Sequence, residues 1–149
     1  VYIEKKEFPL VEEKIEIYGN DYDEKLSIIF ADPNFLMPNL FGTLNVEVKG
    51  SDFTAEVPLS TLLGKATMVI YGKIFTSLNS VTYVINVAGY GPDKGGKIRI
   101  QLDRGRVVMD IEFNIPLGFL NARLIKSRIN DFRDKASELI RLERIKRRL

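Results

Sequence analysis

The stretch that decides the fold runs from Pro116 to Leu149 and has the sequence PLGFLNARLIKSRINDFRDKASELIRLERIKRRL. Its apolar residues, among them Ile125, Ile129 and Phe132, recur at steps of three and four positions, which is the spacing of one face of an α-helix. A proline suits a first helical turn, and no second proline interrupts the stretch. The pattern predicts one amphipathic helix over about residues 117–148, roughly 30 residues and about 45 Å long.

The region before this helix has a different period. Apolar and polar residues alternate from residue 43 to residue 114, and this alternation is typical of strands with one buried face. Turn signals such as Gly50-Ser51-Asp52 divide the region into six runs with short connections, which predicts an antiparallel meander. Residues 11–18 alternate in the same way and add a first strand, so the expected sheet has seven strands.

Two short helices are expected between the first strand and the meander. Residues 22–31 suit a helix with Asn20 or Asp21 as its N-cap. This helix should stop at Asp32-Pro33, because the residue before a proline is pushed out of the α region. Residues 34–40 can form a second helical turn ahead of a proline and a glycine.

The composition suits one domain with a substantial core, because 45% of the 149 residues are hydrophobic. A helix of about 45 Å is too long for a small flat sheet, so we expect the strands to curl around it. The sequence predicts a single α+β domain over residues 1–149. Its architecture should be a seven-stranded curved antiparallel sheet around a long C-terminal helix, with two short helices after the first strand.

Several kinds of chemistry are excluded because the chain contains neither Cys nor His. It has no thiol nucleophile, disulfide, Cys/His zinc site or Ser-His-Asp triad. We predict no catalytic residue, no metal site and no cofactor, although Asp, Glu, Lys and Tyr leave an enzyme possible. No stretch approaches the ~18 apolar residues of a membrane span, and Val1–Lys6 does not resemble a signal peptide. We expect a cytoplasmic protein that can lie at a membrane surface.

A family resemblance is carried by two segments. Residues 25–42, KLSIIFADPNFLMPNLFG, resemble the early part of the carbon monoxide dehydrogenase G-subunit family, in which a short helix ends in Asp-Pro and a proline-containing turn and Gly follow. Phe41 stands where that family is expected to have Pro. Residues 117–125, LGFLNARLI, resemble the family's lead into its last helix. The order of elements is similar to that of the START/Bet v 1 (SRPBCC) helix-grip superfamily.

The resemblance implies a helix-grip fold with a cavity for a lipid-like or polyketide-like molecule. The predicted inward faces of the strands, the long helix and the segment after Asp32 supply the candidate ligand-binding residues. These are Leu36, Met37, Phe41, Val57, Met68, Ile70, Tyr83, Ile85, Val87, Met109, Ile111, Ile125, Arg128, Ile129 and Phe132. For any one apolar residue, a place in a filled core is the more common outcome.

Two features of this site remain open in the sequence. Apolar residues between prolines, from Phe35 to Phe41, suit a lid over a cavity mouth, but they suit equally an anchor that holds the short helices to the core. Polar groups on Tyr71, Tyr83, Asn86 or Arg128 could orient a bound molecule.

Two other patterns favour structural interpretations. Residues 91–97, GPDKGGK, have the spacing of a phosphate-binding loop up to the lysine, but Ile98 follows and the next residues alternate like a strand. A hairpin loop is therefore expected. Asp110 and Glu112 alternate with apolar residues, so they should face solvent near Lys97 and Arg99 rather than form an acid–base pair.

Positive charge is concentrated in the last helix. Residues 117–149 contain 10 Lys and Arg against 4 Asp and Glu, whereas the rest of the chain contains 12 against 16. A solvated helix end is the favoured interpretation of the run from Arg141 to Leu149. An anionic membrane surface or an enzyme partner is the functional alternative. Nucleic acid is disfavoured, because aromatic residues do not interleave with the basic ones.

Three functions follow from these patterns. The first is a carrier or sensor that binds a small apolar or amphipathic ligand without catalysis. The second is an accessory, assembly or membrane-attachment module for a carbon monoxide dehydrogenase-like enzyme. A polyketide cyclase-like enzyme ranks last, because it needs an ionisable group in the cavity. The sequence does not predict the oligomeric state.

Overall fold

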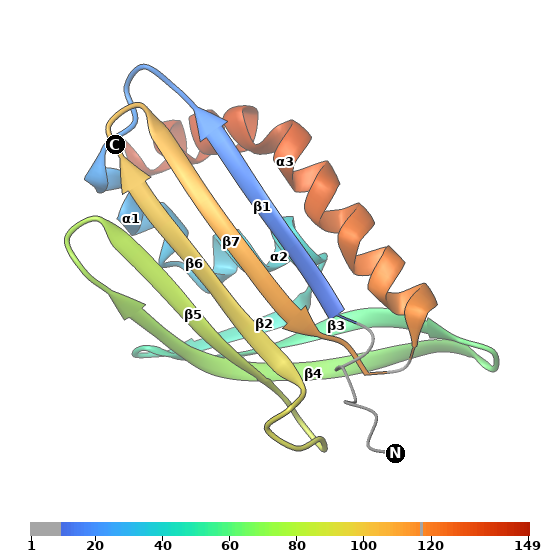
Figure 1. The fold of residues 1–149 in the computed structure, drawn as a ribbon. Coiled ribbons are helices and arrows are strands. Elements are labelled where there is room, and N and C mark those ends of the chain that lie inside the picture. Colours follow the sequence, from blue (N-terminus) through green and yellow to red (C-terminus); the bar gives the residue numbers. More distant parts are fainter. Residues whose placement is uncertain (1–9, 117) are drawn as a thin grey trace, which may run out of the picture.

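The computed structural model describes residues 10–116 and 118–149, and its elements follow the predicted order (Figure 1). The elements are β1 (Leu10–Tyr18), the 3-10 turn η1 (Glu24–Leu26), α1 (Ser27–Phe30), α2 (Pro33–Phe41), β2 (Leu44–Lys49), β3 (Asp52–Thr61), β4 (Gly64–Thr76), β5 (Ser80–Val87), β6 (Gly95–Asp103), β7 (Arg106–Asn114) and α3 (Phe119–Arg147). The predicted α+β fold is confirmed. The expected helix start at Leu117 lies outside the described residues.

All strands belong to one antiparallel sheet with the order β1-β7-β6-β5-β4-β3-β2. Strands β2 to β7 form the predicted meander, and β1 joins it by pairing with β7, where Ile15 lies opposite Met109. The 88–94 segment connects β5 to β6, which pair directly, so the hairpin interpretation of GPDKGGK is confirmed.

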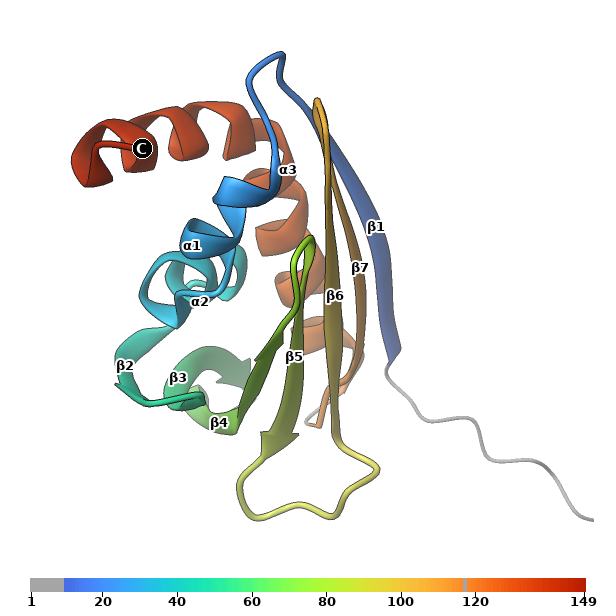
Figure 2. The ribbon, with the colours of Figure 1, turned by 90° about the vertical axis from the view of Figure 1, so that its left-hand side faces the viewer.

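Glycines mark several places where strands of the sheet come unusually close. A Cβ atom on Gly72 of β4 would lie 1.9 Å from the carbonyl oxygen of Val84. One on Gly96 of β6 would lie 1.8 Å from the carbonyl oxygen of Glu112. Only glycine fits such an approach, which is typical of bends in strands. The sheet curls so that β2, β3 and β4 turn beneath the helices, all of which lie on one side of it (Figure 2).

The short helices start and end at identifiable caps. The expected N-cap at Asn20 or Asp21 is wrong, because the Tyr22 N–H bonds to the Gly19 carbonyl in a turn and the first helical residue is Glu24. The Asp23 carboxylate caps it by accepting the N–H of Lys25 at 2.9 Å.

The second short helix is longer than expected, because α2 continues through Pro38 to Phe41. The Asp32 carboxylate caps α2 by accepting the N–H of Asn34 at 2.9 Å. The helix ends at Gly42, whose φ of +67° lies in the left-handed region that glycine adopts without strain.

Strand β2 departs from the predicted alternation. Leu44, Val46 and Val48 stand at alternate positions and would share one face of a regular strand, but Leu44 is 57% exposed and Val48 is 41% exposed. The pairing with β3 shifts register between Leu44 and Glu47, and Asn45 has a φ of +51°. This bulge breaks the two-residue period, so that only Val46 packs against the core.

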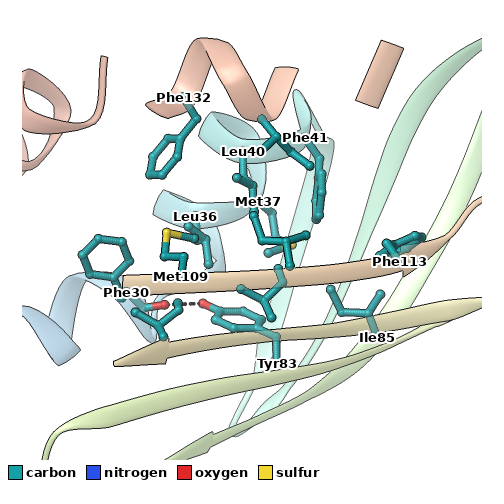
Figure 3. Close-up of a cluster of buried hydrophobic side chains, with 14 of the residues drawn as sticks. Phe30, Leu36, Met37, Leu40, Phe41, Tyr83, Ile85, Met109, Phe113 and Phe132 are labelled. Carbon is teal, nitrogen blue, oxygen red and sulfur yellow. Dashed lines mark hydrogen bonds between the residues drawn. The ribbon is translucent and has the colours of Figure 1, made fainter. Parts of the chain in front are cut away.

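The core lies between the sheet and the three helices, and α2 occupies its centre. Figure 3 shows side chains of α1 and α2 between α3 and the strands. Phe41 of α2 packs edge-on against Phe113 of β7, with ring centroids 5.7 Å apart. The sheet therefore encloses α1 and α2 together with α3, and the space that a single helix would have left is filled largely by α2.

Candidate functional site

A small apolar void lies where α2, β3, β4, β7 and α3 meet. It is an imperfection in the packing that is too narrow to admit a water molecule. The side chains that line it are Phe41, Val57, Met68, Phe113, Ile115 and Ile125. Each of them is at most 4% exposed, and none is ionisable, so the void offers no acid–base group. Phe41, Val57, Met68 and Ile125 belong to the predicted ligand-binding set.

The other apolar members of the predicted set are buried in the same core but do not line this void. They are Leu36, Met37, Ile70, Tyr83, Ile85, Val87, Met109, Ile111, Ile129 and Phe132, each at most 2% exposed. Figure 3 shows how Leu36, Met109 and Phe132 meet between α2, β7 and α3. These side chains fill the interior, and their contact with a ligand stays a prediction.

The segment from Phe35 to Phe41 is part of a helix and not a loop. Phe35, Leu36, Met37, Leu40 and Phe41 are each at most 4% exposed. Their burial in α2 supports the anchoring alternative over a lid.

Arg128 on α3 is a polar residue that contacts Phe41, one of the residues that line the void. It lies one helical turn after Ile125, and its Nη1 donates a hydrogen bond to the carbonyl oxygen of Phe41 at 2.9 Å. The guanidinium has no carboxylate within ion-pair distance among the described residues. Partial burial lowers the pKa of Arg128. Among the described residues, Arg128 is therefore a cation with four donors left and no counter-ion, in contact with a residue that lines the void.

Thr43 adds a second polar atom to this corner. It is 5% exposed, and its Oγ1 has no hydrogen-bond partner in the described structure. It follows Gly42, and a Cβ on Gly42 would lie 3.4 Å from the Nε of Arg128. Thr43 is not among the residues that the sequence predicts for the site. A threonine directly after a helix-ending glycine gives no signal that it is buried.

The remaining polar candidates do not orient anything at the void. The Tyr83 hydroxyl donates to the carbonyl oxygen of Phe30 at 2.6 Å, which holds α1 to β5 (Figure 3). Burial, with a contribution from Asp32, raises the pKa of Tyr83 well above its usual range. The expectation that Tyr71 and Asn86 orient a ligand between the sheet and the helices is wrong. Met68 and Ile70 face the core, so Tyr71 lies on the outer face of β4 and is 45% exposed, and Asn86 alternates with buried neighbours on β5.

The part of the surface that the structure describes contains no candidate metal centre. Within residues 10–116 and 118–149, no group of three or more Asp and Glu side chains is placed to hold an ion. Asp110 and Glu112 are exposed and line a surface hollow with Lys97 and Arg99, as the alternation predicted.

The basic run at the end of α3 is largely paired. Arg147 forms ion pairs with Asp32 and with Glu143. Arg144 pairs with Asp21 at 2.9 Å, which ties α3 to the segment after β1. The carboxylate contacts of Glu143 and Asp32 raise the pKa of Arg147 although burial, the largest single influence, lowers it. No helix in the described part of the chain is long and apolar enough to cross a membrane.

Comparisons with known proteins place this geometry in a family. A protein-family model with the description "-like" matches residues 11–149. No curated protein matches the chain. The chain is similar to a hypothetical protein from Sulfolobus tokodaii, with 24% sequence identity, a TM-score of 0.73, and coverage of 93% of this chain and 99% of that one.

Two further solved structures show the same fold at lower identity. A conserved protein from Geobacillus kaustophilus has 15% identity and a TM-score of 0.59, over 87% of this chain and 95% of that one. The di-domain aromatase/cyclase StfQ from the steffimycin biosynthetic pathway has 9% identity and a TM-score of 0.50, over 88% of this chain and 50% of that one. None of the three is described as part of a carbon monoxide dehydrogenase, so that resemblance stays a prediction.

Proposed function

Because the chain belongs to the family whose model matches residues 11–149 and has the helix-grip fold of Bet v 1-like (SRPBCC) proteins, we propose that it binds a small hydrophobic or amphipathic molecule between its sheet and its helices. In this role it is a carrier or sensor, and the interior contributes binding without chemistry.

The observation that carries this proposal is the apolar void beside Arg128. It has no room for even one water molecule, whereas ligand pockets typically enclose about 300–1,000 Å³, so a ligand must open it. Met68 lines the void, and an unbranched thioether side chain can change rotamer at low cost. Apolar ligand surface buried there would contribute about 25 cal/mol per Å².

Arg128 supports an amphipathic ligand with an acidic end. A partly buried cation without a counter-ion is unfavourable, and a carboxylate that accepts its remaining donors would relieve this cost. The apolar part of the ligand would then extend past Phe41 and Ile125 into the void.

A competition assay tests the proposal. A naphthalene-sulfonate dye should bind the folded protein saturably, and both dodecanoate and dodecanol should displace it. Val57→Phe should weaken all three at least about tenfold, because the ring occupies the void. Val69→Phe is the matched control, since Val69 lies on the outer face of β4 and is 41% exposed. If none of these probes binds wild-type protein, the proposed function is wrong.

The acidic end is tested separately. Arg128→Gln should weaken dodecanoate about tenfold and leave dodecanol unchanged, because only the charged hydrogen bond is lost. Equal loss for both probes would contradict a role for Arg128 in orienting the ligand.

A further inference from the structure

The turn between β3 and β4 presents two leucines to solvent. Leu62 and Leu63 have 102% and 101% of their reference exposed area, so neither contributes to the core. The turn itself is held by Thr61, whose Oγ1 donates to the Gly64 carbonyl at 3.0 Å and accepts the Leu63 N–H at 3.2 Å. Turns of this kind usually carry Gly, Asn, Asp or Ser, so the leucines are not explained by the turn.

A further exposed leucine lies at the same end of the molecule. The side-chain amide of Asn121 donates to the carbonyl oxygen of Ser60 at 2.8 Å and accepts the N–H of Ser60 at 2.9 Å. These bonds hold the hairpin against the first turn of α3, where Leu120 is 72% exposed. In Figure 1 the β3–β4 turn projects beyond the start of α3. We call Leu62, Leu63 and Leu120 the leucine tip.

Positive charges flank the leucine tip. Lys65, Arg123 and Lys126 are exposed, and none of them forms an ion pair within the described residues. The sequences of residues 57–76 and 118–130 contain no Asp or Glu. The first turn of α3 has no acidic residue either, so the partial positive charge of the helix N-terminus is not compensated there.

We propose that the leucine tip docks on an anionic lipid bilayer. The leucines would enter the boundary between headgroups and acyl chains, and Lys65, Arg123 and Lys126 would contact lipid phosphates. Membrane-surface elements of this kind combine apolar residues with Lys and Arg. A stable protein interface instead needs about 800 Å² from each partner, and a projecting turn offers too little flat surface for one.

The docked orientation would bring the lipid close to the interior site. Val57 and Met68, which line the void, belong to the same hairpin as the leucine tip, and Ile125 belongs to the same part of α3. An amphipathic molecule could then pass between bilayer and protein along the contact of hairpin and helix. The docking itself does not depend on the proposed ligand binding.

Flotation with vesicles of phosphatidylcholine and phosphatidylglycerol in equal amounts tests the docking. Wild-type protein should float with these vesicles and bind pure phosphatidylcholine at least tenfold more weakly, because the cations then lack anionic partners. The double variant Leu62→Asp with Leu63→Asp should lose at least about 100-fold in partitioning. The matched control is Leu78→Asp, since Leu78 is 83% exposed in the turn between β4 and β5, at the far end of β4.

Charge reversals locate the docking surface on α3. Arg123→Glu with Lys126→Glu should abolish the preference for phosphatidylglycerol, whereas Lys146→Glu with Arg148→Glu at the other end of the helix should leave it unchanged. The reverse result would place the membrane contact at the C-terminal run and overturn the proposal. The proposal would also be overturned if the aspartate double variant bound the vesicles as well as the wild type does. A wild-type dimer in light scattering that this variant dissociates would overturn it too, because the leucine tip would then contact a second copy of the chain.

Discussion

The two ends of α3 are both basic, but their cations differ in whether they form ion pairs with the rest of the described structure. At the C-terminal end, Arg144 and Arg147 pair with Asp21 and Asp32 and so fasten the helix to the segment that holds η1, α1 and α2. At the N-terminal end, Arg123 and Lys126 are exposed beside the leucine tip without ion pairs among the described residues.

This difference shows that charge density alone does not locate a functional surface. The C-terminal run has the higher density, yet cations there are favourable to the helix dipole and several have carboxylate partners. Arg123 and Lys126 lie beyond the first turn of α3, so the helix dipole does not stabilise them. Their presence is therefore not explained by stability of the helix, and an external anionic partner accounts for it better.

The largest expected effect lies between the two ends, where α3 is anchored to the core. Phe132 is 1% exposed, and Phe132→Ala should lower the free energy of unfolding by about 3–5 kcal/mol. Urea denaturation followed by circular dichroism measures this. The exposed neighbour Arg133→Ala is the control, and a similar small cost for both would mean that the middle of α3 does not hold its ends in place.

The next effect concerns the attachment of the N-terminal end. Asn121 is 1% exposed and bonds to both backbone groups of Ser60, so Asn121→Ala should cost about 2–3 kcal/mol by leaving them unsatisfied. The rate of hydrogen exchange at the Ser60 amide should also increase in this variant. The exposed Ser127→Ala serves as the reference, and unchanged protection at Ser60 would contradict the role of Asn121 as the link between hairpin and helix.

A smaller effect is expected at the C-terminal end. The side chains of Arg147, Asp32 and Glu143 are 25%, 27% and 15% exposed, so their ion pairs are only partly screened by solvent. Arg147→Met should cost about 1–2 kcal/mol, between the values for surface and buried pairs. Lys126→Met at the other end should change stability by less than about 0.5 kcal/mol. If Arg147→Met and Lys126→Met lowered the free energy of unfolding equally, the two ends of α3 would not differ in how their cations contribute to stability.

The segment that receives the C-terminal end can be probed at Tyr83. Tyr83→Phe removes the hydrogen bond to Phe30 and should cost about 1 kcal/mol at neutral pH. Burial raises the pKa of Tyr83 above its usual value near 10, so the folded protein retains a proton that the unfolded chain releases in alkali. The wild type should therefore lose stability above about pH 10 faster than the variant. Parallel pH profiles of the two would contradict this assignment.

Periodicity was sufficient to predict the sheet and α3, since a strand with one buried face and a helix with one apolar face impose distinct spacings. Local geometry was harder to predict. The bulge at Asn45 removes Leu44 and Val48 from the core, and the turn at Gly19 moves the cap to Asp23. Both features depend on local backbone conformation and hydrogen bonds, which the spacing of apolar residues does not indicate.

The site was predicted in part for the same reason. Alternation identified Val57 and Met68 as inward-facing, but it does not report how much space remains between packed side chains. Tyr71 was assigned for its hydroxyl although its own strand alternation places it outside. Leu62 and Leu63 were visible as adjacent leucines, but a run of apolar residues before Gly64 does not distinguish the end of a strand from an exposed turn.

The smallest expected effect separates stability from docking most directly. Leu120 is exposed at the second position of α3, and Leu120→Glu places a negative charge near the positive end of the helix dipole. The variant should gain about 0.3–1 kcal/mol in stability while it partitions several-fold less into anionic vesicles. Leu142→Glu is the matched control, because Leu142 is 49% exposed near the opposite, negative end, where added negative charge should not stabilise the helix. A loss of stability in Leu120→Glu would show that Leu120 belongs to the fold, and the N-terminal end of α3 would then resemble the C-terminal one.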